Sequence, residues 1–522
     1  MKSREKILLA LGVGAIVAGF WLCDQSLVKP AQELEAYRQS LRAQGEKLDI
    51  SELIPPPVPD ESNGLPLLRD AFHEFMPGTV VTTNPPGIPR AVAPGKALAC
   101  WQQPYLWSRG RSNSWADLKL VLETNRLAID LLHQAAAFPD MDFQFDYTNH
   151  PLVGGSSSPA FSPKVAWLLR ASAINHLHEG DPSAAGDDIR ALLKLLQANQ
   201  NMIMADAQGQ RWAMMQMALS ATWELLQFPG LADADLARIE SCWSGLDLLG
   251  ALEKTLEMRR DQEFELSRTL KDSSEATNFF ATADAGARSW PPLSGWEQMA
   301  QDTLTRTKLS VAVFAWRTSW NYSDEELVLR QAQGLVDGVR KMRRNPALLQ
   351  AYNNIDTNSR ALWNTGFLPS PLWKTIGMAQ YRGVFIVGCA VFPEDWNDWL
   401  ASETARRTVV AAITLRRYQL RHGSFPEQLA ELTPDFLPAV PLDPMDGRPF
   451  RYRRNGDGSF LLYSIGFDGV DDGGDPTNNP SSSQTFFFLR PLFWPLPGAR
   501  DWVWPTPATP EEVRDFYDRG LK

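Results

Sequence analysis

Residues 403–475 read ETARRTVVAAITLRRYQLRHGSFPEQLAELTPDFLPAVPLDPMDGRPFRYRRNGDGSFLLYSIGFDGVDDGGD and carry the most specific residue order in the chain. Apolar side chains recur at helical spacing over 403–420, and Gly423 stands where a glycine can end a helix in a left-handed turn. Two alternating runs, 450–452 and 460–463, flank an Asn-Gly-Asp-Gly turn and predict a β-hairpin. The stretch therefore predicts a small α+β module in which a hairpin packs on a helix.

The last loop of this stretch is a candidate cation site. Four aspartates fall within eight residues: Asp468, Asp471, Asp472 and Asp475. Carboxylate oxygens are the ligands that a hard cation such as calcium prefers. A turn rich in aspartate and glycine is also stable without a metal, when backbone N–H groups donate to the aspartate side chains. The residues alone leave both interpretations open.

Three motifs in this order, YQLRHGSFPEQLAEL, PLDPMDGRPFRY and LLYSIGFDGVDDGGD, resemble the C-terminal domain of the type II secretion major pseudopilin. The resemblance implies a loop that binds calcium, in which Ser464 and Asp468 match the serine and aspartate of the family motif. Further carboxylates of the same loop would complete the ligand set: Asp471, Asp472 and Asp475. The chain lacks the prepilin processing signal, so the resemblance implies a pseudopilin-like module used in another architecture. The remainder resembles uncharacterised bacterial membrane-anchored helical proteins.

The composition is that of a globular protein with enough apolar material for a large core. The chain has 522 residues, 44% hydrophobic and 21% charged, and this length predicts more than one domain. The formal net charge of -10 argues against binding to nucleic acid, because neutralising phosphates requires a concentrated basic face. We therefore expect protein partners and no nucleic acid.

The N-terminus predicts a membrane anchor. A basic segment, 1–6, precedes an uninterrupted apolar run over 7–23, which is near the shortest length that spans a bilayer as a helix. The positive-inside tendency places the N-terminus in the cytoplasm and the bulk in the periplasm, with a single pass through a bacterial inner membrane. The alternatives are a cleaved signal peptide, for which the large residues before the cleavage point are unsuitable, and a lipid-modified Cys23, for which Leu22 is unsuitable.

The chain is predicted to be mainly α, with packed helical hairpins and a small C-terminal α+β module. The expected segments are a cytoplasmic tip and transmembrane signal anchor (1–24), a juxtamembrane helix and proline-rich linker (25–110), a helical domain (111–395), the pseudopilin-like module (396–490), and a C-terminal strap with a short helix (491–522).

The helical domain is predicted from apolar periodicity. Its clearest pair of helices spans 164–177 and 183–197, with Gly180 as a cap between them. Further helices are expected at 212–227, 234–246, 249–270, 297–316 and 323–342, with a short buried segment at 383–392. The helix at 323–342 begins with the spacing of a capping box, Ser323 and Glu326.

No nucleophile, base and orienting residue can be assembled from the sequence. One predicted helix carries charged residues at three- and four-residue spacing: Glu253, Glu257, Arg260, Asp261 and Glu265. These residues favour an ion-paired or solvated helix face. The alternative is an acid–base pair of a hydrolase, with Glu257 and Asp261 as its carboxylates.

The four cysteines are scattered and lack the spacing of metal ligands, so no zinc site is expected. In an oxidising compartment Cys100 and Cys242 would be able to pair, and free buried thiols are the other interpretation.

We therefore expect a non-catalytic, membrane-anchored envelope protein with a structural or protein-interaction role linked to secretion, and a module stabilised by calcium. Two alternatives remain open. One is the envelope hydrolase with helix-borne carboxylates, and the other is a helical module that binds peptides in an open aromatic groove.

Overall fold

The computed structural model describes residues 29–75, 91–108, 111–143, 163–273, 321–351, 394–479 and 498–520, and the positions 145, 147, 276, 310, 313, 314, 316, 317, 353 and 494. The predicted anchor over 7–23 and the segment at 383–392 lie outside these residues, as does most of 297–316. Among the helices that are described, none combines the length and the apolar character needed to cross a bilayer.

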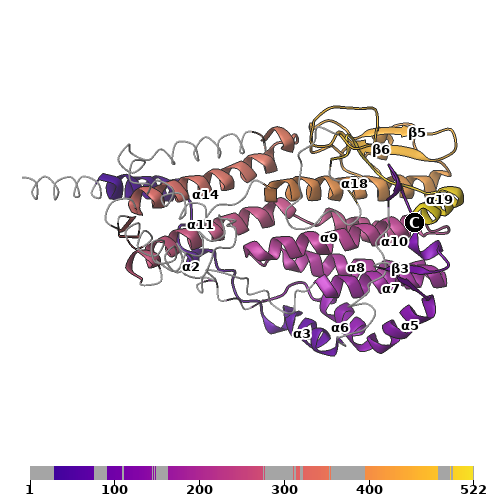
Figure 1. Ribbon diagram of the computed structural model, residues 1–522, viewed down its shortest axis with the longest axis horizontal. Helices are drawn as coiled ribbons and strands as arrows, with labels where there is room; N and C mark the ends of the chain where they lie inside the picture. Colours follow the sequence, from indigo (N-terminus) through magenta and orange to yellow (C-terminus); the bar gives the residue numbers. More distant parts are fainter. Residues whose placement is uncertain are drawn as a thin grey trace, which may run out of the picture.

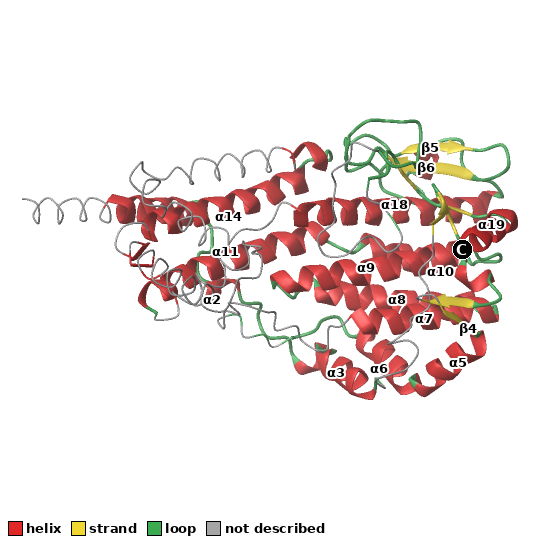
Figure 2. Ribbon diagram, in the orientation of Figure 1, coloured by secondary structure: helices red, strands yellow, loops and turns green. Residues whose placement is uncertain are grey.

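The described chain is mainly helical, with a few short strands (Figure 2). The helices are the one over 29–43, α2 (Ile50–Leu53), α3 (Leu65–Glu74), α5 (Trp115–Thr124), α6 (Arg126–Ala137), α7 (Pro163–Glu179), α8 (Pro182–Asn199), α9 (Ala205–Leu226), α10 (Asp233–Ser244), α11 (Leu248–Asp272), α14 (Asn321–Arg344), α18 (Glu394–His422) and α19 (Pro510–Gly520). The strands are β1 (Ala91–Ala93), β2 (Lys96–Ala97), β3 (Leu106–Ser108), β4 (Arg111–Asn113), β5 (Arg451–Arg454), β6 (Phe460–Ser464), β7 (Trp502–Val503) and β8 (Thr506–Pro507). This content confirms the mainly α prediction.

Helices α7 and α8 form the predicted helical hairpin, and both pack against α9. Gly180 ends α7 with a φ of +87°, a backbone conformation that glycine adopts at little cost. Asp181 then caps α8 by accepting the backbone N–H of Ala184 at 3.0 Å. The hairpin therefore forms where the sequence predicts it, for the local reasons that the sequence supplies.

The largest apolar cluster of the described residues extends from α3 to the C-terminal tail. Helix α18 contacts α9 and α10 on one side and strand β6 on the other, and Figure 1 shows it between these helices and the sheet. The expected boundary between the segments 111–395 and 396–490 thus falls within the first residues of α18. This helix contacts elements of both segments.

The helix over 29–43 packs on α11 and α14 at the end of the molecule opposite the sheet (Figure 1). Leu34 shares a small apolar cluster with Phe264 of α11. The guanidinium of Arg330 lies 3.9 Å from the centre of the Tyr37 ring, a cation–π contact. The predicted juxtamembrane helix is therefore part of the folded body.

The C-terminal module contains the antiparallel sheet β5-β6-β7. Its β5–β6 hairpin is the predicted one, whereas β7 comes from the tail, where Val503 pairs with Tyr463 and Trp502 with Ser464. Strand β8 then pairs in parallel with β2. The tail over 498–507 thus supplies one strand to each of two sheets. The segment predicted as a strap with a short helix, 491–522, therefore also contains two short strands.

The predicted end of the helix over 403–420 is confirmed, and the short helix expected within 491–522 is α19. Gly423 follows α18 with a φ of +80°. Thr509 caps α19: its Oγ1 accepts the backbone N–H of Glu512 at 3.3 Å, and its own N–H donates to the Glu512 carboxylate at 2.8 Å.

Two local expectations are wrong or not realised. The structure places Ser323 inside α14, which already includes Asn321, so this serine does not cap the helix, and Glu326 instead pairs with an arginine one turn on. No disulfide joins Cys100 to Cys242, so the pairing considered for them is not formed.

Candidate functional site

The predicted cation loop follows β6, and Ser464 at the end of that strand is completely buried. Its hydroxyl donates to Asp443 Oδ1 at 2.7 Å, and Asp443 also accepts the backbone N–H groups of Met445 and Ile465, each at 3.0 Å. Burial raises the pKa of Asp443 despite these donors. Ser464, the serine of the family motif, therefore positions Asp443 of the PLDP sequence. Asp443 was not among the predicted site residues.

Arg451 on β5 joins three carboxylates of the module. It donates to Asp446 at 2.6 Å and to Asp471 at 3.2 Å, and lies 3.4 Å from Asp443. Asp471 also accepts the hydroxyl of Tyr463 at 2.9 Å. Partial burial raises the pKa of Asp471, but its backbone, tyrosine and arginine donors outweigh burial and leave that pKa below its ordinary value. Asp471 is thus a carboxylate held by protein donors.

The other predicted ligands lie on different partners. Asp468 accepts the side-chain amide of Asn479 at 3.0 Å. Asp472 and Asp475 both approach the guanidinium of Arg500, at 3.3 and 3.7 Å. In the described residues, no group of three or more His, Cys, Asp or Glu side chains is placed to hold a metal ion. The calcium ligand set therefore stays a prediction.

Asp501, in the tail immediately before β7, contacts this loop and was not among the predicted site residues. It is completely buried, and its Oδ2 accepts the backbone N–H groups of Gly474 at 2.7 Å and Asp475 at 3.1 Å. Its Oδ1 is buried and has no hydrogen-bond partner among the described residues. Burial raises the pKa of this carboxyl to about 6. The only available signal was its position before the alternating run Trp502-Val503-Trp504, which is typical of a strand.

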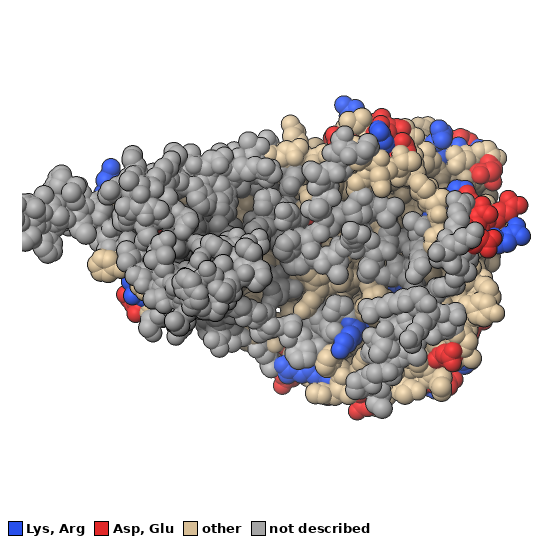
Figure 3. Space-filling view, viewed as in Figure 1, with Lys and Arg blue, Asp and Glu red and all other residues tan. Residues whose placement is uncertain are grey.

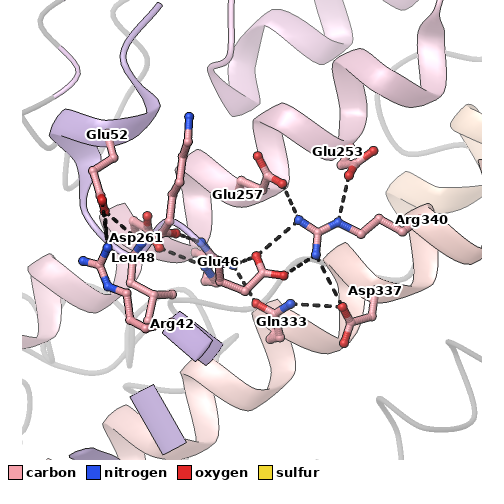
Figure 4. A network of polar contacts seen from close by, with 12 residues as sticks. Arg42, Glu46, Leu48, Glu52, Glu253, Glu257, Asp261, Gln333, Asp337 and Arg340 are labelled. Atoms are coloured by element: carbon pink, nitrogen blue, oxygen red, sulfur yellow. Dashed lines mark hydrogen bonds and ion pairs between the residues drawn. The ribbon is translucent and has the colours of Figure 1, made fainter. Parts of the chain in front are cut away.

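At the other end of the molecule, Glu46 binds arginines from two helices, and Figure 4 shows its contact with one of them, Arg340. Arg260 of α11 donates to Glu46 at 3.0 Å, and Arg340 of α14 binds both of its carboxylate oxygens. Arg340 also donates to Glu253 at 2.8 Å and to Glu257 at 2.6 Å. Burial alone would raise the pKa of Glu46, but the arginine donors outweigh it and lower that pKa. We call this set, with Asp261, the Glu46 network.

The carboxylates considered for hydrolysis belong to this network. Asp261 is buried and accepts from Arg260 Nε at 2.8 Å, and burial raises its pKa to about 6. Glu257 accepts from Arg340, and Glu265 pairs with Arg268 at the surface. The ion-paired interpretation of this helix face is therefore confirmed.

A groove of about 580 Å³ lies beside this network and is named here the α11 groove. It is formed by the segment over 52–58, the segment over 140–147 and α11, with single residues from other loops. Its lining residues are Lys47, Glu52, Leu53, Ile54, Pro55, Pro56, Pro57, Val58, Asp140, Met141, Asp142, Phe143, Phe145, Tyr147, Asn201, Ile203, Lys254 and Glu257. Successive aromatic rings follow one wall, with centroids 6.3 Å apart for Phe143 and Phe145 and 6.0 Å for Phe145 and Tyr147. The groove is aromatic, as the peptide-binding alternative requires, but it lies between loops and one helix.

The surface charges around the C-terminal module are mixed. On the face in Figure 3, the described Lys and Arg side chains are interspersed with Asp and Glu over the end that carries the sheet. Many of these charges form ion pairs across elements, such as Arg421 with Asp233 at 2.6 Å.

Comparison of the chain with protein-family models, curated proteins and solved structures gives no match. Its function is therefore argued from the described residues and from the motifs of the sequence.

Proposed function

We propose that the protein is a non-catalytic, membrane-anchored envelope protein whose C-terminal module is a rigid docking unit for protein partners. The observation that carries the proposal is the attachment of the module to the helical body at several points. Strand β7 pairs with β6, β8 pairs with β2, and Trp223 of α9 donates its indole N–H to the carbonyl of Pro505 at 2.8 Å. A surface fixed in this way has little conformational entropy to lose when a partner binds.

The arrangement of charges supports a structural role for the helical body. Glu257 and Asp261, the carboxylates considered for a hydrolase, are each bound to an arginine on the same or a neighbouring helix. A general base must be within reach of the proton that it abstracts, and a carboxylate committed to a guanidinium is poorly suited to that role.

The proposal assigns anchoring to the apolar run over 7–23, with the N-terminus in the cytoplasm. The helix over 29–43 then packs on α11 and α14, at the end of the molecule opposite the module (Figure 1). In the proposed topology the module lies away from the membrane, where partners in the periplasm can reach it. The resemblance to the major pseudopilin supports a partner linked to secretion.

Calcium in the aspartate loop is part of the proposal. The ligands implied by the resemblance are Ser464, Asp468, Asp471, Asp472 and Asp475, and Asp501 supports the site because its buried Oδ1 has no hydrogen-bond partner among the described residues. Bound calcium would have to replace the contacts of Arg500 with Asp472 and Asp475. It would fix the loop against β6 and β7.

The calcium claim is tested by thermal melting of the full-length protein in detergent, with about 1 mM calcium or with a chelator. Calcium is expected to raise Tm, and Asp468→Asn is expected to reduce the rise. Magnesium is the control for a non-specific divalent effect. An unchanged Tm together with no bound metal by elemental analysis would exclude calcium and leave the docking role to be tested separately.

The docking role is tested with two surface variants of similar exposure. The side chain of Arg448 in the module is 80% exposed, and that of Arg126 on α6 is 83% exposed. Each arginine lies 4.0 Å from an aspartate. Proteins that co-purify with the full-length protein from native envelopes should be lost with Arg448→Glu and kept with Arg126→Glu. The same partners with both variants would place docking elsewhere.

A further inference from the structure

The thiol of Cys100 contacts two buried charged side chains, which come from different helices. Cys100 begins the short 3-10 helix η2 (Cys100–Gln102), which packs on α7. Its sulfur accepts from the guanidinium of Arg170 on α7, and its S–H donates to the carboxylate of Glu224 on α9. Arg170 and Glu224 are completely buried, whereas Cys100 is partly exposed. We call these three residues the Cys100 cluster.

Several hydrogen bonds fix the position of the thiol. The backbone N–H of Cys100 donates to both carboxylate oxygens of Glu224, at 2.9 and 3.0 Å. The indole N–H of Trp101 donates to the backbone carbonyl of Glu224 at 3.1 Å. Arg170 Nε donates to Ser220 Oγ at 2.8 Å. The sulfur, the carboxylate and the guanidinium are therefore held in contact by the surrounding fold.

The charges of the Cys100 cluster suit transfer of the thiol proton to Glu224. Burial raises the pKa of Glu224 to about 7, toward the value of about 8.5 that is ordinary for a thiol. When the proton moves from the sulfur to the carboxylate, the negative charge moves in the opposite direction, and the charged Arg170 interacts with it in both states. The guanidinium stabilises the resulting thiolate, which is the nucleophilic form of cysteine.

We propose that Cys100 is a modification site at which a small hydroperoxide oxidises the thiol to a sulfenic acid. Glu224 takes the thiol proton, and the sulfur forms a bond to one oxygen of the hydroperoxide as the O–O bond breaks. The leaving hydroxide or alkoxide receives the proton from Glu224, while Arg170 stabilises the moving negative charge. One thiol and one hydroperoxide give one sulfenic acid and one water or alcohol, with two electrons passing from sulfur to oxygen.

The exposure of Cys100 favours a small reagent. The residue is only partly exposed, and its sulfur already contacts two buried side chains. A hydroperoxide needs to bring only one oxygen atom to the sulfur, whereas a larger electrophile would have to displace the groups around it. The reaction requires neither calcium nor a protein partner, so it goes beyond the proposed docking role.

Cys242 provides an internal comparison. Like Cys100 it is partly exposed, and it packs against the apolar core. Burial raises the pKa of its thiol, although the charges of Lys194 and Arg190 act in the opposite direction. Cys242 therefore keeps its proton more firmly than an ordinary thiol does, and we expect it to react slowly.

The test measures sulfenic acid at each cysteine. Full-length protein in detergent is reduced, freed of reductant, and treated at about pH 7 with hydrogen peroxide and dimedone, which traps sulfenic acids. Peptide mass spectrometry should show that the dimedone adduct forms at least about tenfold faster at Cys100 than at Cys242. Equal rates at the two cysteines would overturn the proposal.

A substitution of Glu224 tests the proton transfer. Glu224→Gln keeps an acceptor for the backbone N–H of Cys100 but cannot take the thiol proton, so oxidation at Cys100 should slow about tenfold or more. Glu263→Gln is the matched control, because Glu263 is a buried glutamate that pairs with Arg259 on α11. It should leave the rate at Cys100 unchanged.

The rate at Cys242 reports whether each variant is folded, and it should stay at the parental level. An unchanged rate at Cys100 in a folded Glu224→Gln protein, or equal losses in Glu224→Gln and Glu263→Gln, would contradict the proposal. A rise at Cys242 would mark an unfolded variant, and the comparison of the two cysteines in the parent would then decide.

Discussion

Glu46 Oε2 lies 3.0 Å from Arg260 Nη1, although the two residues are 214 positions apart in the chain. The guanidinium of Arg260 is completely buried, and the side chain of Glu46 is 8% exposed. The pair connects the segment after the first described helix to α11. Breaking a buried ion pair of this kind destabilises the folded protein, because the remaining charge is left without a partner in surroundings that solvate it poorly.

Glu46→Gln is therefore expected to lower the free energy of unfolding by about 3 kcal/mol, with Asp261 and Gln333 still bound to Arg260. The measurement is equilibrium unfolding in urea. Glu35→Gln is the matched control, because Glu35 pairs with Arg38 at the surface and its loss should cost less than about 1 kcal/mol. Equal effects of the two substitutions would mean that the buried pair contributes no more than an exposed one.

His133 and Asp188 connect α6 to α8 through a contact of 2.7 Å between Nε2 and Oδ1. The hydrogen bond to Asp188 raises the pKa of His133 above its ordinary value of 6.5. The stabilisation that this pair provides is therefore complete below pH 6.5 and is lost as the pH rises through the higher pKa of the folded state. His133→Gln should lower Tm more at about pH 5.5 than at about pH 9.

Thermal melts of the parent and His133→Gln proteins across this pH range check the prediction. Asp188→Asn should abolish the same pH dependence, because it removes the partner and leaves the imidazole in place. A difference in Tm that is the same at every pH would show that the histidine acts through packing alone.

Asp501 should give a pH dependence from a carboxyl group. Burial raises its pKa from 3.8 to about 6, so the folded state favours the protonated form. Its contribution to stability is present below pH 3.8 and is lost as the pH rises through about 6. In calcium-free buffer, the stability of the parent should therefore fall relative to that of Asp501→Asn between these pH values. Urea unfolding at a series of pH values measures the difference, and parallel curves would contradict it.

Two glycines with positive φ should respond differently to alanine. Gly466 has a φ of +66°, and a Cβ there would lie 2.5 Å from the carbonyl oxygen of Arg500. Gly423 has a φ of +80° and nothing within 4 Å of that position. Gly423→Ala should cost about 1 kcal/mol from backbone strain alone. Gly466→Ala should cost at least about 2 kcal/mol more, because the tail must move away from the sheet.

Urea unfolding measures both costs, and limited proteolysis locates the second. Cleavage in the tail should increase in Gly466→Ala and stay at the parental level in Gly423→Ala. Equal losses of unfolding free energy for Gly466→Ala and Gly423→Ala would mean that the tail can move at little energetic cost. That result would weaken the proposal that the module is rigidly attached.

Local structure could be predicted well from the sequence. Apolar periodicity and a single glycine, Gly180, were enough to place the α7–α8 hairpin, and the alternation around the Asn-Gly-Asp-Gly turn was enough to place β5 and β6. These features depend on neighbours within a few residues. The capping-box spacing at Ser323 failed because the same residue types also occur inside a helix, where glutamate pairs with an arginine one turn on.

The candidate sites could be predicted only in part. The ion-paired face of α11 was expected from its spacing, but its main partner, Glu46, comes from a loop more than two hundred residues earlier. The aspartates after β6 were singled out, whereas Asp501 was not, because it reaches the loop only through the pairing of β7 with β6. The α11 groove depends on three segments that no local pattern relates to one another.

The parallel pairing of β2 with β8 also determines when this protein can finish folding. Thr506 donates its backbone N–H to the carbonyl of Gly95 at 3.0 Å, and the two residues are 411 positions apart. A chain that leaves the ribosome from its N-terminus exposes the hairpin of β1 and β2 long before β8 has been made. The last strand of that sheet, β8, can be added only when synthesis is almost complete. A chain truncated before Trp502 lacks both β7 and β8, so two sheets miss an edge strand. We expect proteases to remove such a chain.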